Sequence, residues 1–128
     1  MSDKRTSVSG SCHCGAVRFE ADVTPPVTLL DCNCSMCART GFLHLIVDHT
    51  EFRLLTDPAA LAEYRFGTGA ARHLFCKNCG IKSFYQPRSH PGGWSVNWRC
   101  LDDTKGLEPE IVPFDGRGGW EAARAALD

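Results

Sequence analysis

Asp31-Cys32-Asn33-Cys34-Ser35-Met36-Cys37 carries three thiols within six consecutive positions. Two cysteine pairs flank this segment, Cys12-x-Cys14 upstream and Cys76-x-x-Cys79 downstream. Thiols clustered in this way serve either as metal ligands or as a redox relay. Four thiols complete a tetrahedral zinc site, whereas three protein ligands leave one coordination position free. Our working hypothesis is that the seven cysteines divide into one closed group and one open group.

Length and composition indicate one ordinary globular domain spanning residues 1–128. The chain has 128 residues, of which 43% are hydrophobic and 23% are charged, values typical of a folded single domain. Its formal net charge is -1 and its isoelectric point is about 6.5, and basic residues are scattered along the chain. Nucleic-acid-binding modules normally carry a basic patch, so we expect no nucleic-acid partner.

The thiol count points to metal binding in a reducing compartment. No apolar segment approaches the ~20 residues that span a bilayer, and the start, Met1 to Arg5, leads into no signal-peptide core. We therefore expect a cytoplasmic protein whose eight cysteines are kept reduced. Spacings of C-x-C and C-x-x-C are typical of metal chelation and not of loop-closing disulfides. Zinc is the expected metal, ahead of iron.

Strand patterns dominate the rest of the chain. Charged and apolar residues alternate in Val17–Val23, as in a half-buried strand. Residues i and i+2 of a strand point the same way, so Cys12 and Cys14 in extended chain just before it can both face one ion. Phe42–Val47 is apolar on both faces, which predicts a central strand. Further extended segments are predicted at residues 27–30, 52–55, 64–66, 81–85 and 94–100.

Helix signals are few. Asp57-Pro58 has the chemistry of a helix start, although nearby glycines leave room for only a turn or two. Ala38–Gly41 is predicted to be a turn, and Trp120–Leu127 a short C-terminal helix. The first few residues are expected to carry no element. The predicted fold is therefore mainly β, with zinc-stapled antiparallel sheets and a terminal helix.

Spacing alone allows three ways of sharing the cysteines between metals. Cys12 and Cys14 can join Cys76 and Cys79 in a closed four-sulfur site, which leaves Cys32, Cys34 and Cys37 with an open position. Either competing partition puts five sulfurs on one ion and leaves two unused. We prefer the first partition because it uses every thiol and closes a long loop across the chain.

The three-cysteine group has a structural and a functional interpretation. In the structural one, a second zinc takes a fourth protein ligand, for which the candidates are Cys100, His44, His49 and His73. Cys100 shares a strand face with two tryptophans, so a buried core thiol is the simpler interpretation, and a single histidine is more often a hydrogen-bonded polar residue than a ligand. In the functional interpretation, Cys32, Cys34 and Cys37 hold a catalytic ion whose fourth position takes water or a substrate.

A zinc ion with three thiolates carries net negative charge, so it is a weak Lewis acid. It still deprotonates a thiol that enters the open position, and the resulting thiolate is a nucleophile suited to aldehydes. The residues thus point to carbon–sulfur chemistry on a small thiol. Candidate partners for an anionic group on that thiol are Arg39, Lys82, Arg88 and Arg99.

The chain resembles the glutathione-dependent formaldehyde-activating enzyme (GFA) family. The resemblance is carried by Ser11–Phe19, Cys32–Cys37 and Phe75–Gly80, and it covers nearly the whole chain. Within the family, the segments most similar to the centromere protein V branch are Phe84–Ser89, Cys100–Asp102, Phe114–Gly116 and Trp120-Glu121.

This resemblance implies coiled antiparallel β-sheets with two zinc ions. It implies a structural zinc on the residues that match Cys12, Cys14, Cys76 and Cys79, and a more labile zinc on those that match Cys32, Cys34 and Cys37. The implied reaction joins formaldehyde to glutathione, giving S-hydroxymethylglutathione, and its class is carbon–sulfur lyase. Two alternatives are a non-catalytic zinc-stabilised interaction module and a zinc or thiol sensor. The oligomeric state does not follow from the residues.

Overall fold

A computed structural model describes residues 5–66, 69, 71–87 and 92–115. The predicted fold class is confirmed: the protein is mainly β, with three sheets. The predicted helix at residues 120–127 lies outside the described residues. None of the helices in the described part of the chain combines the length and apolar character that a membrane crossing requires.

The first sheet has three antiparallel strands, in the order β1 (Thr6–Ser11), β2 (Arg18–Val23) and β5 (Phe52–Leu54). In β2 the apolar residues Phe19, Ala21 and Val23 are buried and alternate with more exposed charged residues, as the sequence pattern predicts. Strand β1 was not predicted, because its Ser- and Gly-rich sequence lacks apolar alternation. It forms because its backbone pairs with β2 over its whole length.

The second sheet has five strands, in the order β10 (Glu110–Phe114), β3 (Thr28–Cys32), β4 (His44–Asp48), β9 (Gly93–Asn97) and β8 (Phe84–Tyr85). Its middle strand is β4, as the run of apolar residues predicts. The expectation of purely antiparallel sheets is wrong here, because β10 pairs with β3 in parallel. This pairing joins the C-terminal part of the chain to the strand that precedes the three-cysteine segment.

A two-stranded sheet, β6 (Leu61–Tyr64) with β7 (His73–Cys76), completes the fold. Short 3₁₀ turns are η1 (His49–Glu51), η2 (Pro58–Ala60) and η3 (Trp98–Cys100). Asp57 caps η2 and Pro58 begins it, as predicted. The predicted strand at 94–100 ends at Asn97, because the Asn97 side chain accepts a hydrogen bond from Arg99 N and starts η3 instead.

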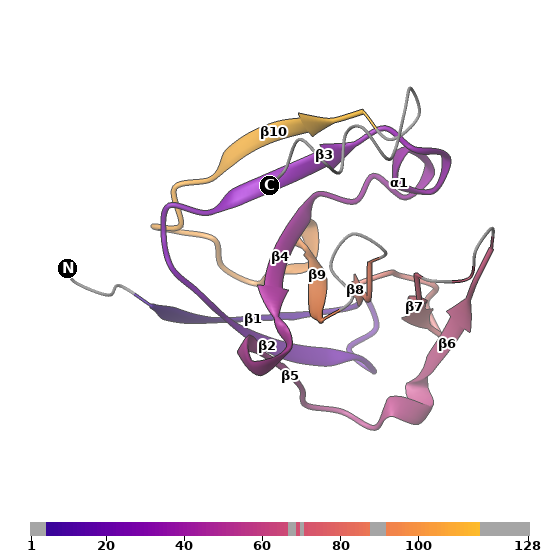
Figure 1. Ribbon diagram of the computed structural model, residues 1–128. Helices are drawn as coiled ribbons and strands as arrows, with labels where there is room; N and C mark the ends of the chain where they lie inside the picture. Colours follow the sequence, from indigo (N-terminus) through magenta and orange to yellow (C-terminus); the bar gives the residue numbers. More distant parts are fainter. Residues whose placement is uncertain (1–4, 67–68, 70, 88–91, 116–128) are drawn as a thin grey trace.

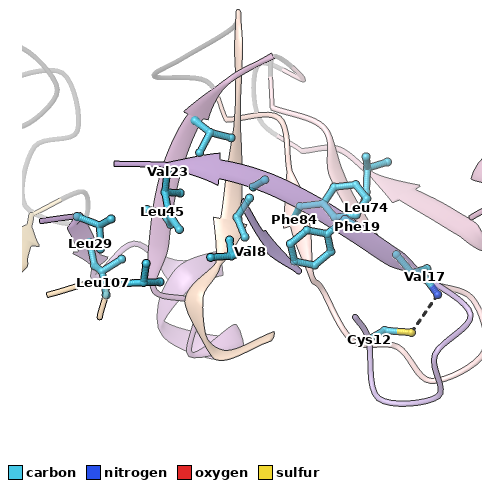
Figure 2. Packing of buried hydrophobic residues seen from close by; sticks show 14 of the residues in the cluster. Val8, Cys12, Val17, Phe19, Val23, Leu29, Leu45, Leu74, Phe84 and Leu107 are labelled. Carbon is cyan, nitrogen blue, oxygen red and sulfur yellow. Dashed lines mark hydrogen bonds between the residues drawn. The ribbon is translucent and has the colours of Figure 1, made fainter. Parts of the chain in front are cut away.

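The core lies between the two larger sheets. Figure 1 shows β3 and β10 on one side of the molecule and β1, β2 and β5 on the other, with β4 and β9 between them. Phe19 of β2 meets Phe84 of β8 edge to face, with ring centroids 5.7 Å apart, and both are fully buried (Figure 2). Burial of such aromatic side chains contributes a large hydrophobic free energy, so this contact helps to hold the two sheets together.

Candidate metal centres

Two loops bring the first cysteine group together. Cys12 and Cys14 lie in the connection between β1 and β2, and not on a strand as predicted. Val17 N donates to Cys12 Sγ at 3.3 Å, which folds this connection back on itself (Figure 2). The two residues face one another through this loop geometry instead of the i, i+2 spacing of a strand.

The second loop is the turn after β7. Asn78 N and Cys79 N both donate to Cys76 Sγ, at 3.3 and 3.4 Å. Gly80 closes the turn with a φ of 79°, a conformation that glycine adopts readily and that would strain any other residue. Backbone amides directed at a sulfur offset the charge that it carries when it binds a metal ion, so the turn suits a metal-ligating cysteine.

The four sulfurs of Cys12, Cys14, Cys76 and Cys79 lie within 4.8 Å of one another. Cys14 Sγ is 3.7 Å from Cys12 Sγ and 3.6 Å from Cys76 Sγ. A tetrahedral zinc with ordinary zinc–sulfur bonds separates its ligand sulfurs by about 3.8 Å. The donor set therefore fits zinc in number, type and spacing, and it joins residues that are 62 positions apart in the chain.

The second group sits on helix α1 (Ser35–Thr40), where the sequence analysis wrongly predicted a turn over its second half. Cys34 is the N-cap residue, and its Sγ accepts a hydrogen bond from Cys37 N at 3.4 Å. The helix ends at Gly41, whose N–H bonds Cys37 O. The cap is why this short segment is helical: a thiol takes the place that a serine or aspartate oxygen usually fills.

Cys32, at the end of β3, completes a group of three sulfurs that lie within 4.8 Å of one another. Cys32 and Cys37 are buried, and Cys34 is half-buried. The nearby Cys32 thiol and burial raise the pKa of Cys37 far above its ordinary range. Three thiols this close, two of them buried, can ionise together only beside a cation, so this donor set also fits a metal ion. Both cysteine groups can thus bind zinc.

His44 approaches this group without joining it. Its Nε2 lies 3.1 Å from Cys37 Sγ, but the mutually close group contains only the three sulfurs. A histidine nitrogen and a cysteine sulfur bound to one tetrahedral zinc would lie about 3.5 Å apart. The observed 3.1 Å between His44 Nε2 and Cys37 Sγ is shorter and matches a direct N–H···S contact. The geometry therefore favours His44 as a hydrogen-bond partner of Cys37 over His44 as a fourth ligand.

The protonation of His44 follows from its other contacts. Its Nδ1 lies 2.8 Å from Ser95 Oγ and 3.3 Å from Tyr85 Oη. Both hydroxyls can donate to Nδ1, which leaves the ring proton on Nε2, facing sulfur. Burial, followed by the charges of Lys82 and His73, lowers the pKa of His44 to about 3. His44 is therefore neutral near pH 7 and donates one hydrogen bond to Cys37.

Ser95 and Tyr85 were not singled out by the sequence analysis. Ser95 is fully buried in β9, and Tyr85 is buried in β8. The available signal was Ser95, a small polar residue inside an otherwise apolar strand, because a buried hydroxyl needs a hydrogen-bond partner. Nothing in the sequence showed that this partner would be His44.

The other candidates lie elsewhere. His73 is buried and contacts Lys82, and His49 is exposed on η1. Cys100 belongs to neither sulfur group. It packs against the main core as a partly buried residue of η3, and not as the fully buried strand residue that the simpler interpretation expected. Arg88 lies outside the described residues.

Two predicted anion partners flank α1. Arg39 Nη1 donates to Ser35 O at 3.0 Å, and Arg99 Nε donates to Gly41 O at 3.1 Å. Both side chains are exposed. Arg39 belongs to the last turn of α1 and Arg99 contacts the residue that ends it, so both place positive charge against the helix that carries Cys37.

The fold and the two sulfur groups define a small β protein with two cysteine groups whose sulfurs are close enough to hold a metal ion, one of four cysteines and one of three. Residues 7–116 match the family model of the glutathione-dependent formaldehyde-activating enzyme, so the chain belongs to this GFA family. A crystal structure of a Rhodobacter sphaeroides protein is 33% identical to the chain, with a TM-score of 0.71. That similarity covers 81% of this chain and 99% of the other.

Proposed function

We propose that this protein is a zinc-dependent enzyme of the carbon–sulfur lyase type that acts on a small thiol–aldehyde adduct such as S-hydroxymethylglutathione. One observation carries the proposal: in the described part of the chain one sulfur group is complete for zinc, and the other is one ligand short. The family's name supplies the substrate class, a thiol and formaldehyde.

In this proposal Cys12, Cys14, Cys76 and Cys79 hold a structural zinc, and Cys32, Cys34 and Cys37 hold the catalytic one. When bound there, zinc supplies a fourth position at which a thiol is deprotonated near neutral pH. The hydrogen bond from His44 to Cys37 withdraws electron density from that thiolate. It thereby lowers the excess negative charge of the three-sulfur group and favours entry of a further sulfur.

The proposed reaction is reversible and needs no oxidant. The substrate sulfur attacks the carbon of formaldehyde, one carbon–sulfur bond forms, and the carbonyl oxygen gains the proton that the thiol has lost. Phe42 and Tyr85 pack against His44, with ring centroids 4.6 and 5.6 Å from it. These rings shield one side of the group from water, which strengthens each electrostatic interaction there.

Glutathione suits this site by charge as well as by its thiol. It carries two carboxylates, and the exposed side chains of Arg39 and Arg99 both contact the backbone of α1 or its C-cap. Guanidinium groups pair well with carboxylates. We propose a small thiol such as glutathione as partner, in the cytoplasm where glutathione is abundant, with neither a membrane nor nucleic acid as partner.

The test is adduct formation followed by NMR exchange spectroscopy. Zinc-loaded protein is mixed with glutathione and formaldehyde, and the exchange rate between free and adduct glutathione is compared with that in buffer. We expect acceleration that disappears in Cys34→Ser, with the four-sulfur zinc retained. No acceleration with glutathione or with other small thiols would contradict catalysis. Release of only the three-cysteine zinc by mild oxidation would then favour the sensor alternative.

A further inference from the structure

Lys82 is a buried cation without a carboxylate partner. In the sequence it lies between Cys79 of the four-sulfur group and β8, and the residue is only 8% exposed. Among residues 5–66, 69, 71–87 and 92–115, no aspartate or glutamate forms an ion pair with it. A buried charge without an opposite charge is costly, so the site must supply another form of compensation.

The contacts of Lys82 hold its ammonium in one place. Its Nζ lies 2.7 Å from His73 Nδ1 and 3.9 Å from the centroid of the Tyr85 ring, with the Phe42 ring at 5.3 Å. His73 is itself stacked between Phe66 and Tyr85, with ring centroids 5.3 and 5.0 Å away. Cation–π contacts and a fixed acceptor orient the ammonium but contribute no full negative charge.

Lys82 is nevertheless charged near neutral pH. Burial lowers its pKa to about 8, while the thiolates of Cys37 and Cys34 act in the opposite direction. Burial, and then the charge of Lys82, lowers the pKa of His73 to about 4. His73 is therefore a neutral acceptor for the ammonium. The Phe42 and Tyr85 rings that contact this ammonium also pack against His44, whose Nε2 lies 3.1 Å from Cys37 Sγ. The ammonium therefore lies one layer of side chains from the three-cysteine group.

The charge of the metal-loaded group explains why a cation is needed there. Three thiolates and one divalent ion leave one net negative charge, and a substrate thiolate at the fourth position adds a second. The Coulomb energy of an added anion rises steeply in a poorly hydrated site. A neighbouring ammonium offsets that energy. Lys82 is a buried cation whose ring partners Phe42 and Tyr85 also contact His44 beside Cys37.

We infer that Lys82 is a positioning residue of the three-cysteine centre: its ammonium, held by His73, balances the negative charge of the centre and favours binding of an anionic sulfur ligand. This inference rests on the proposed function only in taking a thiol as the ligand. It predicts a contribution to metal retention and thiol binding even if no reaction follows.

The experiment measures binding and not turnover. Cobalt-loaded wild type, Lys82→Met and Lys82→Arg are titrated with glutathione and with 2-mercaptoethanol, without aldehyde, and the sulfur-to-cobalt charge-transfer absorption is followed. Zinc loss to a chelator is measured in parallel. Lys105→Met is the control, because Lys105 is exposed in a loop. Retention of the four-sulfur zinc reports that each variant is folded.

We expect Lys82→Met to bind both thiols at least ~10-fold more weakly, because a modest loss of interaction free energy changes the affinity tenfold. The variant should also lose the zinc of the three-cysteine group faster than wild type, while the zinc of the four-sulfur group is retained. Lys82→Arg should retain much of the binding, and Lys105→Met should equal wild type. Thiol affinity and zinc retention unchanged in Lys82→Met would overturn the inference. If wild type binds thiol but accelerates no adduct formation, the proposed function fails while this inference stands.

A second variant serves if Lys82→Met does not fold. His73→Phe keeps the aromatic stack and removes the nitrogen that holds Lys82 Nζ. We expect several-fold weaker thiol binding in this variant. A folded His73→Phe protein with wild-type thiol affinity and zinc retention would also overturn the inference.

Discussion

At the scale of single residues, Gly10 shows how closely β1 packs on its neighbours. A Cβ built on Gly10 would lie 2.5 Å from Phe19 Cζ and 2.6 Å from the carbonyl oxygen of Cys100. Phe19 is fully buried at the centre of the core, so its ring has little room to move. This glycine is therefore required for lack of space and not for an unusual backbone angle.

We expect Gly10→Ala to lower the free energy of unfolding by about 1–3 kcal/mol, the usual cost of overpacking a core. Gly92→Ala is the matched control, because no atom lies within 4 Å of its added Cβ. Thermal or denaturant unfolding of the two zinc-loaded variants makes the comparison. Equal stability of Gly10→Ala and wild type would show that β1 can move away from Phe19.

At the scale of elements, Arg53 links three strands of the first sheet. From β5 it donates to both carboxylate oxygens of Asp22 on β2, at 2.9 and 3.0 Å. It also reaches Glu20 on β2 at 3.3 Å and Ser7 on β1 at 3.4 Å. The side chain is 41% exposed, so solvent screens these pairs and their contribution is modest.

We expect Arg53→Met to lower the midpoint of thermal unfolding slightly at low salt. The difference should shrink toward zero in about 1 M salt, where the screening length is about 3 Å. Arg53 lowers the pKa of the Asp22 carboxyl below its usual 3.8, so the stabilisation is present above that pH and is lost as pH falls through the lowered pKa. A salt-independent difference would point to lost packing instead.

At the scale of the whole molecule, the four-sulfur group connects the β1–β2 loop to the turn after β7. Structural zinc contributes roughly 10–16 kcal/mol of apparent binding free energy in small zinc peptides. A domain of this size is stable by only about 5–15 kcal/mol. Removal of such an ion therefore removes an amount of free energy comparable with the whole stability.

We expect a chelator to remove metal in two steps. The three-cysteine ion should leave first with the β-sheet signal intact, and the four-sulfur ion should leave later together with unfolding. Metal analysis and far-ultraviolet circular dichroism on the same samples make the measurement. Cys34→Ser should eliminate only the first step, and Cys76→Ser should prevent stable folding. Loss of both ions without unfolding would contradict a structural role.

Features that depend on local sequence pattern were predictable, whereas features that depend on contacts between distant parts of the chain were not. The partition into four and three cysteines was predictable, because thiols this dense have few alternative uses in a reduced protein. The strand at Val17–Val23 and the central strand β4 (His44–Asp48) were predictable from hydrophobic pattern. The strands β1 and β10 were missed, because their pairing partners, and not their own side chains, make them strands.

What the sequence by itself determined is therefore the inventory: a mainly β chain, seven clustered thiols and the spacing that pairs them. Only the tertiary structure decided that His44 contacts Cys37 from β4. It also decided that the ammonium of Lys82, three positions after Cys79, lies on the Phe42 and Tyr85 rings that pack against His44. The physical reason is that metal ligation is encoded by local spacing, whereas hydrogen bonds and charge balance around it depend on which strands pair.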